Sequence, residues 1–389
     1  MNTFQALTLD LQQDGWEKSR GFIKRTVVAP ELTTSNPKDA VSVILKIKYA
    51  GLCGSDRGIW NRAAFSEMFK TSLAAEGKSL RILGHEFVGE VLAVGSSVET
   101  LYGIKVGDTV SGDSHVTCGN CFQCRIGEAE VCQDQAILGI STDGIFAQQV
   151  KLPAKNLWQI DLERIRPEVA AIFDPFCNAV HALTKTDVRG ARVAIFGCGQ
   201  IGMFAILLAR HFGAAKVIGI DTNPANVEMA KALGAHEGIV IQKSQKAHDY
   251  DVDADAIAQI NKLTYGKGVD VSLEMAGFNS SVNNCIAATR FGGSVVLFGI
   301  KDGDFMIPNF SRMIVKGLTV HNVIGRQIFK TWQISQRVLS DASNGVQDKV
   351  WNTILKGGNG TVIKLSDYTP ELMEQKMAEH PKLVFDIQN

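Results

Sequence analysis

The stretch ARVAIFGCGQIGMFAILLARHFGAAKVIGID, residues 191–221, decides the fold class of this chain. It begins with an apolar run, 193–196, that suits a buried parallel strand. The glycines that follow in the spacing G-x-G-x-x-G are Gly197, Gly199 and Gly202. Such glycines permit a tight turn and let backbone N–H groups approach a pyrophosphate at the start of a helix. The stretch therefore predicts a strand–turn–helix–strand unit that binds a dinucleotide.

The end of this stretch bears on which dinucleotide is bound. Asp221 closes the second strand 19 residues after Gly202. A carboxylate there accepts hydrogen bonds from the ribose hydroxyls of NAD and repels the 2′-phosphate of NADP. The residues that follow, DTNPAN, contain no arginine to hold that phosphate, so the sequence favours NAD. The alternative is the same fold without a dinucleotide.

Two later segments have the same rhythm. VDVSLEMAG (269–277) and GGSVVLFGI (292–300) are short apolar runs that end in small residues, and we expect them to be further strands of one parallel sheet. The polar segment 237–268 predicts a loop and a surface helix. Together these segments predict an α/β Rossmann domain, a doubly wound parallel sheet.

Four of the eight cysteines lie close together in HVTCGNCFQCRIGEAEVC, residues 115–132. They are Cys118, Cys121, Cys124 and Cys132, in the spacing C-x2-C-x2-C-x7-C. Four thiolates can surround one tetrahedral Zn²⁺ and leave no position open for a substrate, so this pattern predicts a structural zinc. Disulfides or inert thiols are the alternatives, and a reducing compartment disfavours disulfides.

The first 170 residues have a different pattern of apolar residues and glycines. Short, alternating, glycine-punctuated runs, such as 40–54, 87–98 and 105–113, predict a compact β-rich domain. The segment 60–82 interrupts them with helical spacing. Cys53, His85 and Glu86 are three competent zinc ligands that would leave a fourth position open for chemistry, although such a set is weak evidence alone.

Composition excludes several classes of function. Forty basic and forty acidic residues cancel, without a basic stripe, which argues against nucleic acid and membrane surfaces as partners. The N-terminal MNTFQALTLDLQQDG does not have the pattern of a signal peptide, and the apolar MFAILLARHF is too short to span a bilayer. We therefore expect a cytoplasmic protein, and a chain of 389 residues predicts two domains.

Taken together, these motifs make the chain similar to the zinc-dependent medium-chain dehydrogenases over almost its whole length. GHEFVGEV (84–91) and the four-cysteine segment carry that resemblance, while AAIFDPFCNAVHA (170–182) and KGLTVHNVIGRQIFKTW (316–332) resemble the threonine dehydrogenase branch. The resemblance implies a GroES-like catalytic domain, residues 1–173 and 326–389, with the zinc lobe at 115–135. It also implies a Rossmann NAD-binding domain at 174–325, and a homotetramer.

The resemblance also assigns individual residues. It implies a catalytic zinc on Cys53, His85 and Glu86, with Asp174 as a further ligand, and hence two zinc ions per chain. It implies that Ser55 passes a proton outward and that His115 lies near the substrate. The further cofactor contacts that it implies are Ile201, Phe298, Gly299, Ile300, Val323 and Ile324.

Three functions follow. The first is NAD-dependent oxidation of a small-molecule alcohol, L-threonine or a related β-hydroxy amino acid. The second is oxidation of a sugar or polyol. The threonine enzymes carry a histidine where this chain has Gly58, and often an arginine where it has Asn226. The chain also has the insertion 60–82, and these departures weaken the case for threonine. The third, a non-catalytic binding protein on the same fold, predicts broken zinc ligands, and none is broken.

Overall fold

The computed structural model describes residues 2–242, 247–300 and 303–389. The chain forms two compact units: Met1–Pro175 with Gln327–Ala342 and Leu355–Asn389, and Phe176–Arg326 with Ser343–Ile354. These boundaries differ from the expected ones by one or two residues at the two main junctions and by the segment Ser343–Ile354. That segment joins the second unit because its apolar side chains Val346, Val350 and Ile354 are buried there.

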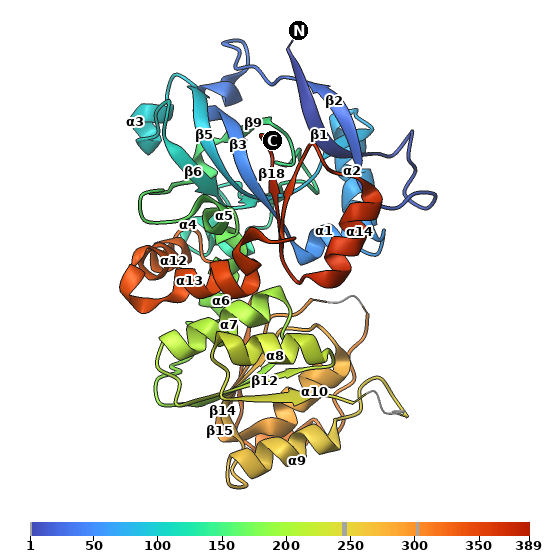
Figure 1. The fold of residues 1–389 in the computed structure, drawn as a ribbon, viewed down its shortest axis with the longest axis vertical. Coiled ribbons are helices and arrows are strands. Elements are labelled where there is room, and N and C mark those ends of the chain that lie inside the picture. The colour runs from blue at the N-terminus through green and yellow to red at the C-terminus, as the bar shows by residue number, and fades with distance from the viewer. Residues whose placement is uncertain (1, 243–246, 301–302) are drawn as a thin grey trace. The chain divides into compact units, whose positions relative to one another are not determined.

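The second unit is built on a six-stranded sheet in the order β13-β12-β11-β14-β15-β16, in which every pairing is parallel (Figure 1). The strands are β11 (Arg192–Phe196), β12 (Lys216–Asp221), β13 (Glu237–Val240), β14 (Val269–Glu274), β15 (Thr289–Leu297) and β16 (Thr319–Asn322). The chain reverses direction across the sheet between β11 and β14, and ligands of such sheets bind at the carboxyl ends of the strands beside this point. The expected doubly wound parallel sheet is confirmed.

Helices cover both faces of this sheet, α7 and α8 packing together on one face and α9 and α10 on the other (Figure 1). The helices of the unit are α7 (Gln200–His211), α8 (Pro224–Leu233), α9 (Ala254–Leu263), α10 (Asn279–Ala288), α11 (Ser311–Val315), α13 (Val346–Lys349) and the π-helical η5 (Val350–Ile354), while α6 (Phe173–Leu183) runs across the unit boundary. Helix α7 is apolar on all sides, and its residues 202–209 are all buried. That explains the uninterrupted apolar letters that follow the glycines.

The expectation for residues 237–268 is wrong in one part. Helix α9 is the expected surface helix, but Glu237–Val240 form the edge strand β13, paired in parallel with β12. Only Ile239 of this strand is fully buried, so the sequence has almost no strand pattern there. The strand forms because the neighbouring β12 offers unpaired backbone groups. Residues 243–246 lie outside the described residues.

The first unit is β-rich, as expected, and contains three sheets. Strands β1 (Thr3–Asp10), β2 (Ile23–Val28) and β4 (Leu80–Ile82) form the first, and β7 (His115–Val116) and β8 (Ala136–Ile137) the smallest. The largest contains β3 (Ser42–Leu52), β5 (Glu86–Val94), β6 (Thr109–Gly112), β9 (Gln149–Pro153), β10 (Leu157–Gln159), β17 (Val362–Lys364) and β18 (Leu383–Asp386). The helices are α1 (Gly54–Trp60), α2 (Ser66–Glu76), α3 (Val98–Tyr102), α4 (Phe122–Arg125), α5 (Pro167–Ala170), α12 (Lys330–Ser340) and α14 (Pro370–Glu379).

Two features of this unit position the site. Strand β18, near the C-terminus, pairs with β3 (Figure 1), and the register Leu383 to Leu52 places the beginning of β18 beside the residue that precedes Cys53. The insertion 60–82 contains helix α2 and buries Phe69 against Trp16, with ring centroids 5.4 Å apart. The expected helix in the insertion is therefore confirmed, and it is anchored to the first unit by its own apolar face.

Candidate active site

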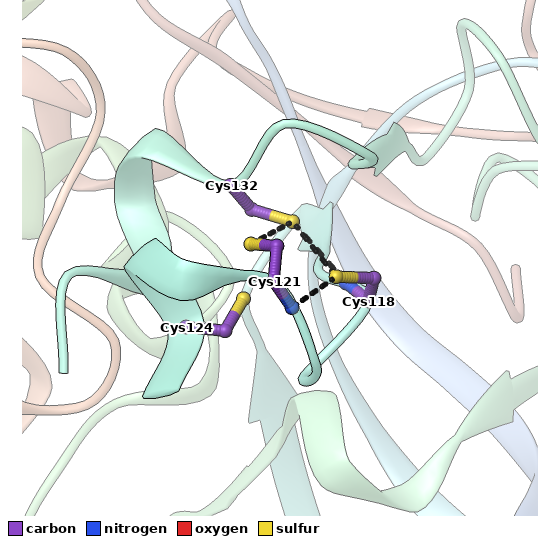
Figure 2. Close-up of side chains that lie close together, drawn as sticks. All are labelled: Cys118, Cys121, Cys124 and Cys132. Atoms are coloured by element: carbon purple, nitrogen blue, oxygen red, sulfur yellow. Dashed lines mark hydrogen bonds between the residues drawn. The ribbon is translucent and has the colours of Figure 1, made fainter. Parts of the chain in front are cut away.

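Four cysteine sulfur atoms converge in a small lobe of the first unit (Figure 2). Cys121 caps α4 and Cys132 ends a short 3-10 turn, which folds the lobe back so that all four sulfurs lie within 4.8 Å of one another. The Sγ atom of Cys132 lies 3.6 Å from that of Cys118 and 3.8 Å from that of Cys121. Four thiolates around a zinc at about 2.3 Å have neighbouring sulfurs about 3.8 Å apart. The donor set and its spacing therefore fit Zn²⁺.

Backbone groups favour thiolates in this lobe. The N–H groups of Asn120 and Cys121 donate to the Cys118 sulfur at 3.4 and 3.3 Å, and they lower its pKa. Backbone N–H groups of Cys124 and Gln133 likewise lower the pKa of Cys121 to about 6. Because thiolates, and not thiols, bind metals, the backbone prepares these two sulfurs for a cation. All eight cysteines are free thiols in this structure.

A second group of ligand atoms lies at the adjoining ends of β3 and β5. Cys53 follows β3 and His85 precedes β5, and the antiparallel register pairs Gly51 with Glu86. One ligand atom from each of Cys53, His85 and Glu86 lies within 4.8 Å of the other two. A Cβ atom on Gly51 would overlap the Glu86 carboxylate, so glycine at this position leaves room for that side chain. The strand pairing therefore brings Cys53 next to His85 and Glu86, which lie more than thirty positions later in the sequence.

The surroundings of His85 are negatively charged. Its Nδ1 atom lies 3.6 Å from Oδ1 of the buried Asp56, and its Nε2 atom lies 3.4 Å from Oγ of Ser55. Burial opposes a charge on His85, but Asp56, Cys53 and Glu86 outweigh burial and raise the pKa of His85 to about 10. Cys53, His85 and Glu86 offer one sulfur, one nitrogen and one oxygen atom to a single point in negatively charged surroundings, so the donor set fits Zn²⁺ here as well.

Asp56 and Lys382 complete this site, and the sequence analysis missed both. Asp56 accepts the Cys53 backbone N–H at 2.8 Å, which fixes the start of α1, and its burial raises its pKa. The Lys382 ammonium group pairs with the Glu86 carboxylate, and both side chains are fully buried. The position of Asp56 three residues after Cys53 is a capping signal that could have revealed it. The partner of Lys382 depends on the pairing of β18 with β3, which no local pattern reveals.

Asp174 and His115 lie outside this metal-binding group among the described residues. The Asp174 carboxylate is buried and accepts the backbone N–H of Ser114 at 3.0 Å. The backbone N–H of His115 donates to Asp113 at 2.9 Å, at the base of the four-cysteine lobe. The second oxygen of Asp113 accepts a 3.0 Å hydrogen bond from the buried indole of Trp332. The first unit thus fixes the backbone around both residues.

The expected dinucleotide residues gather at one edge of the sheet in the second unit. Gly197 follows β11 with φ +98°, and a Cβ on Gly202 would overlap the Gly197 carbonyl oxygen, so the turn packs tightly against α7. Asp221 ends β12 and accepts the backbone N–H groups of Cys198 at 2.7 Å and Asn223 at 2.8 Å. These bonds orient the carboxylate at the carboxyl edge of the sheet.

The other expected contacts lie on the same edge. Val323 and Ile324 follow β16, and Phe298, Gly299 and Ile300 follow β15. The Phe298 and Gly299 N–H groups donate to the Glu274 carbonyl oxygen at 3.0 and 3.2 Å, and Ile201 lies in the first turn of α7. All the predicted cofactor residues therefore follow or adjoin strand ends of one sheet.

Comparison with known proteins gives a consistent result. The family model "Zinc-binding dehydrogenase" matches residues 201–340, and "Alcohol dehydrogenase GroES-like domain" matches 39–162. L-threonine 3-dehydrogenase of Bacillus licheniformis is 35% identical over 295 residues, which cover 76% of this chain and 79% of that protein.

Solved structures are similar over the whole chain. Alcohol dehydrogenase TADH from Thermus sp. ATN1 has a TM-score of 0.77 at 23% identity and covers 98% of this chain and 99% of its own. A putative zinc-binding dehydrogenase from Sinorhizobium meliloti bound to NADP has a TM-score of 0.73 at 25% identity and covers 99% of this chain and 100% of its own. The GroES-like and Rossmann folds expected from the sequence are thereby confirmed.

Proposed function

The chain belongs to the zinc-dependent medium-chain dehydrogenases, and from this premise we propose that it oxidises a secondary alcohol and transfers the hydride to NAD. One observation carries the proposal: Cys53, His85 and Glu86 converge, beside the Ser55 hydroxyl, in a chain 35% identical to an L-threonine 3-dehydrogenase. L-Threonine or a related β-hydroxy amino acid is the first candidate substrate.

Cys53, His85 and Glu86 would hold the catalytic zinc; Asp174, which the resemblance implies as a further ligand, lies outside this group and would bind the metal only if its carboxylate moved toward it. A zinc ion bound there supplies Lewis acidity, which lowers the pKa of an alcohol hydroxyl. The protein holds its ligands in a fixed geometry through Asp56, which faces Nδ1 of His85, and through Lys382, which faces Glu86. Such outer partners orient metal ligands and tune their basicity.

Ser55 is the proposed proton acceptor for the substrate hydroxyl. Its Oγ atom lies 3.4 Å from His85 Nε2, so it is beside the atoms that would hold the metal. A hydroxyl can accept a proton from substrate while it passes its own proton onward, which makes it a relay. His115 is proposed to contact the substrate. Its backbone N–H donates to the Asp113 carboxylate, which holds the backbone of His115 in position.

NAD is the proposed hydride acceptor. Asp221 has the acceptor oxygens that a ribose diol requires, and its charge opposes a 2′-phosphate. Asn226 donates its side-chain amide to Asp221 at 3.3 Å and helps to hold that carboxylate in place. These contacts support NAD over NADP.

The four-cysteine lobe is the proposed site of a second, structural zinc. Its four sulfurs are all provided by the protein, so no position is left for a substrate, and the metal would stabilise a lobe that has little secondary structure of its own. Thiolate ligands require a reducing compartment, which supports a cytoplasmic location.

A homotetramer is also proposed. Ile314 and Val315 of α11 are 70% and 73% exposed, in the same unit as the edge strand β16. Exposed apolar side chains of this size are typical of surfaces that another subunit covers.

The structure contains, among its described residues, no helix long and apolar enough to cross a membrane.

Oxidation of a sugar or polyol is the second candidate, and one observation favours it. A Cβ atom on Gly58 would lie only 3.0 Å from the Cβ of Ala64, and the Ala63 N–H donates to the Gly58 carbonyl at 2.9 Å. The turn that starts the insertion therefore leaves little room for a Cβ at position 58, where the threonine enzymes carry a histidine.

A substrate panel tests the proposal. NADH formation by the zinc-loaded protein would be followed with L-threonine, sorbitol, glucose and 2,3-butanediol, and S55A would serve as the chemical control. Turnover of L-threonine that S55A lowers supports the first candidate. Turnover of sorbitol or glucose without L-threonine supports the second, and no NAD reduction with any alcohol would refute the proposal.

A further inference from the structure

Arg57 has contacts that the proposed chemistry does not explain. It lies in α1, four residues after Cys53, and its guanidinium group donates to three backbone carbonyl oxygens. These are the oxygens of Met377 at 2.8 Å, His380 at 2.6 Å and Pro381 at 3.1 Å. A planar group with five donors is suited to hold several acceptors in one arrangement.

The three carbonyls belong to the end of α14 and the turn that follows. The helix stops at Glu379 with His380 as its cap, and Pro381 prevents its continuation. The last carbonyls of a helix have no partner within the helix, and a cation there is favourable. Arg57 therefore provides the partners that this turn requires, from a helix that begins at a proposed zinc ligand.

The next residue after this turn is Lys382. Its ammonium group donates to the Leu52 carbonyl at 3.1 Å and pairs with the Glu86 carboxylate. The segment 377–382 is thus held at two points by the segment 52–57, once through Arg57 and once through Lys382. Lys382 is fully buried. If the turn shifted, water could therefore not replace the contacts that its ammonium group would lose.

We propose that Arg57 is a positioning residue that holds Lys382 against Glu86 and so sets the place of Glu86 at the catalytic metal. The inference rests on the proposed function and deepens it. The backbone N–H of Arg57 donates to the Cys53 carbonyl at 3.2 Å within α1, a bond that any residue except proline would make there, whereas its guanidinium group acts through the turn 377–381. Loss of such a partner typically costs 10–100-fold in metal affinity or activity.

Metal retention tests the inference independently of turnover. The rate at which zinc is lost from the Cys53 site to a chromogenic chelator would be measured for wild type, R57A, R57K and R20A. Arg20 is the matched control because it also pairs with α14, through Glu374 at 2.7 Å, but on an exposed surface. We expect R57A to release zinc about tenfold faster, R57K to recover part of the loss, and R20A to match wild type.

A double-mutant cycle distinguishes positioning from general support of the fold. If Arg57 acts through Lys382, R57A adds nothing to the release rate in a K382M background. An undiminished effect of R57A in that background, or a release rate of R57A equal to wild type, overturns the inference. If K382M does not accumulate as folded protein, K382Q provides the same cycle. A wild-type protein without a Cys53-dependent zinc would overturn the proposed function as well, so the two failures are distinguishable.

Discussion

Two of the three glycines of the nucleotide turn, Gly199 and Gly202, have different tasks, and alanine at each should separate them. A Cβ on Gly202 would come closer to the Gly197 carbonyl oxygen than the 3.0 Å that real Cβ atoms keep, and that oxygen is backbone that cannot turn aside. A Cβ on Gly199 meets no protein atom within 4 Å, and its φ of −70° suits alanine. G202A should therefore damage the fold, and G199A should not.

The magnitude follows from the overlap. Forcing an extra methyl group into a packed contact costs about 1–3 kcal/mol. For a unit of this size each kcal/mol lowers the melting temperature by about 2–4 °C, so G202A should melt roughly 2–12 °C below wild type. G199A should melt within about 2 °C of wild type, since a surface substitution usually changes stability by no more than about 0.5 kcal/mol.

Cofactor binding should show a different pattern. The backbone at Gly199 must lie close to the pyrophosphate, so its methyl group should weaken NADH binding on the order of tenfold although the fold is intact. G202A should weaken binding too, because the N–H groups at the start of α7 move with the displaced turn. Scanning calorimetry of the cofactor-free protein and NADH fluorescence titration measure the two effects. A G202A protein as stable as wild type, or a G199A protein that loses as much stability as G202A, would refute the packing argument.

Four further outcomes are expected. C121S should lower the zinc content from two to one per chain and lower the melting temperature, by metal analysis and calorimetry, because three thiolates cannot close a tetrahedral site. S55A should lower kcat on the order of 10²-fold and leave the melting temperature unchanged, by steady-state kinetics, if Ser55 is the proton relay. D221S should raise kcat/KM for NADP relative to NAD about tenfold, because the carboxylate that opposes a 2′-phosphate is removed. Burial opposes ionisation of Asp270, but two arginine guanidinium groups outweigh burial and hold the pKa of that carboxyl well below its usual range. The carboxylate therefore stabilises the fold above about pH 4, and this contribution is lost as the pH falls toward the lower pKa of the folded state. D270N should therefore cost about 1.5 kcal/mol in urea unfolding at pH 7, with a smaller difference near pH 3; an equal difference at both pH values would contradict this assignment.

The insertion illustrates how far local pattern goes. Helical spacing in 60–82 correctly predicts α2, because an amphipathic face is written in the residues themselves. The same residues do not reveal that Phe69 packs on Trp16, since that partner comes from another segment. The absence of a histidine at position 58 is visible in the sequence, and the close approach of Ala64 to Gly58 is a local contact within the turn that starts the insertion.

The nucleotide-binding unit and the four-cysteine group follow from local patterns in the sequence: glycines that one turn requires, short apolar runs typical of buried strands, and cysteines close enough along the chain to surround one ion. Cys53, His85 and Glu86 can be recognised in the sequence as possible zinc ligands, but alone they are weak evidence. The pairing of β3 with β5, which brings Cys53 to His85, is seen only in the structure.

The groups that support those residues can be identified only from the tertiary structure. Strand β13 forms because β12 offers it backbone partners, and Lys382 meets Glu86 because β18 pairs with β3 across more than three hundred residues. Arg57 holds the turn that precedes Lys382 for the same reason. A buried charge or an unpaired backbone group must find a partner wherever the fold provides one, and that requirement leaves no periodic trace in the sequence.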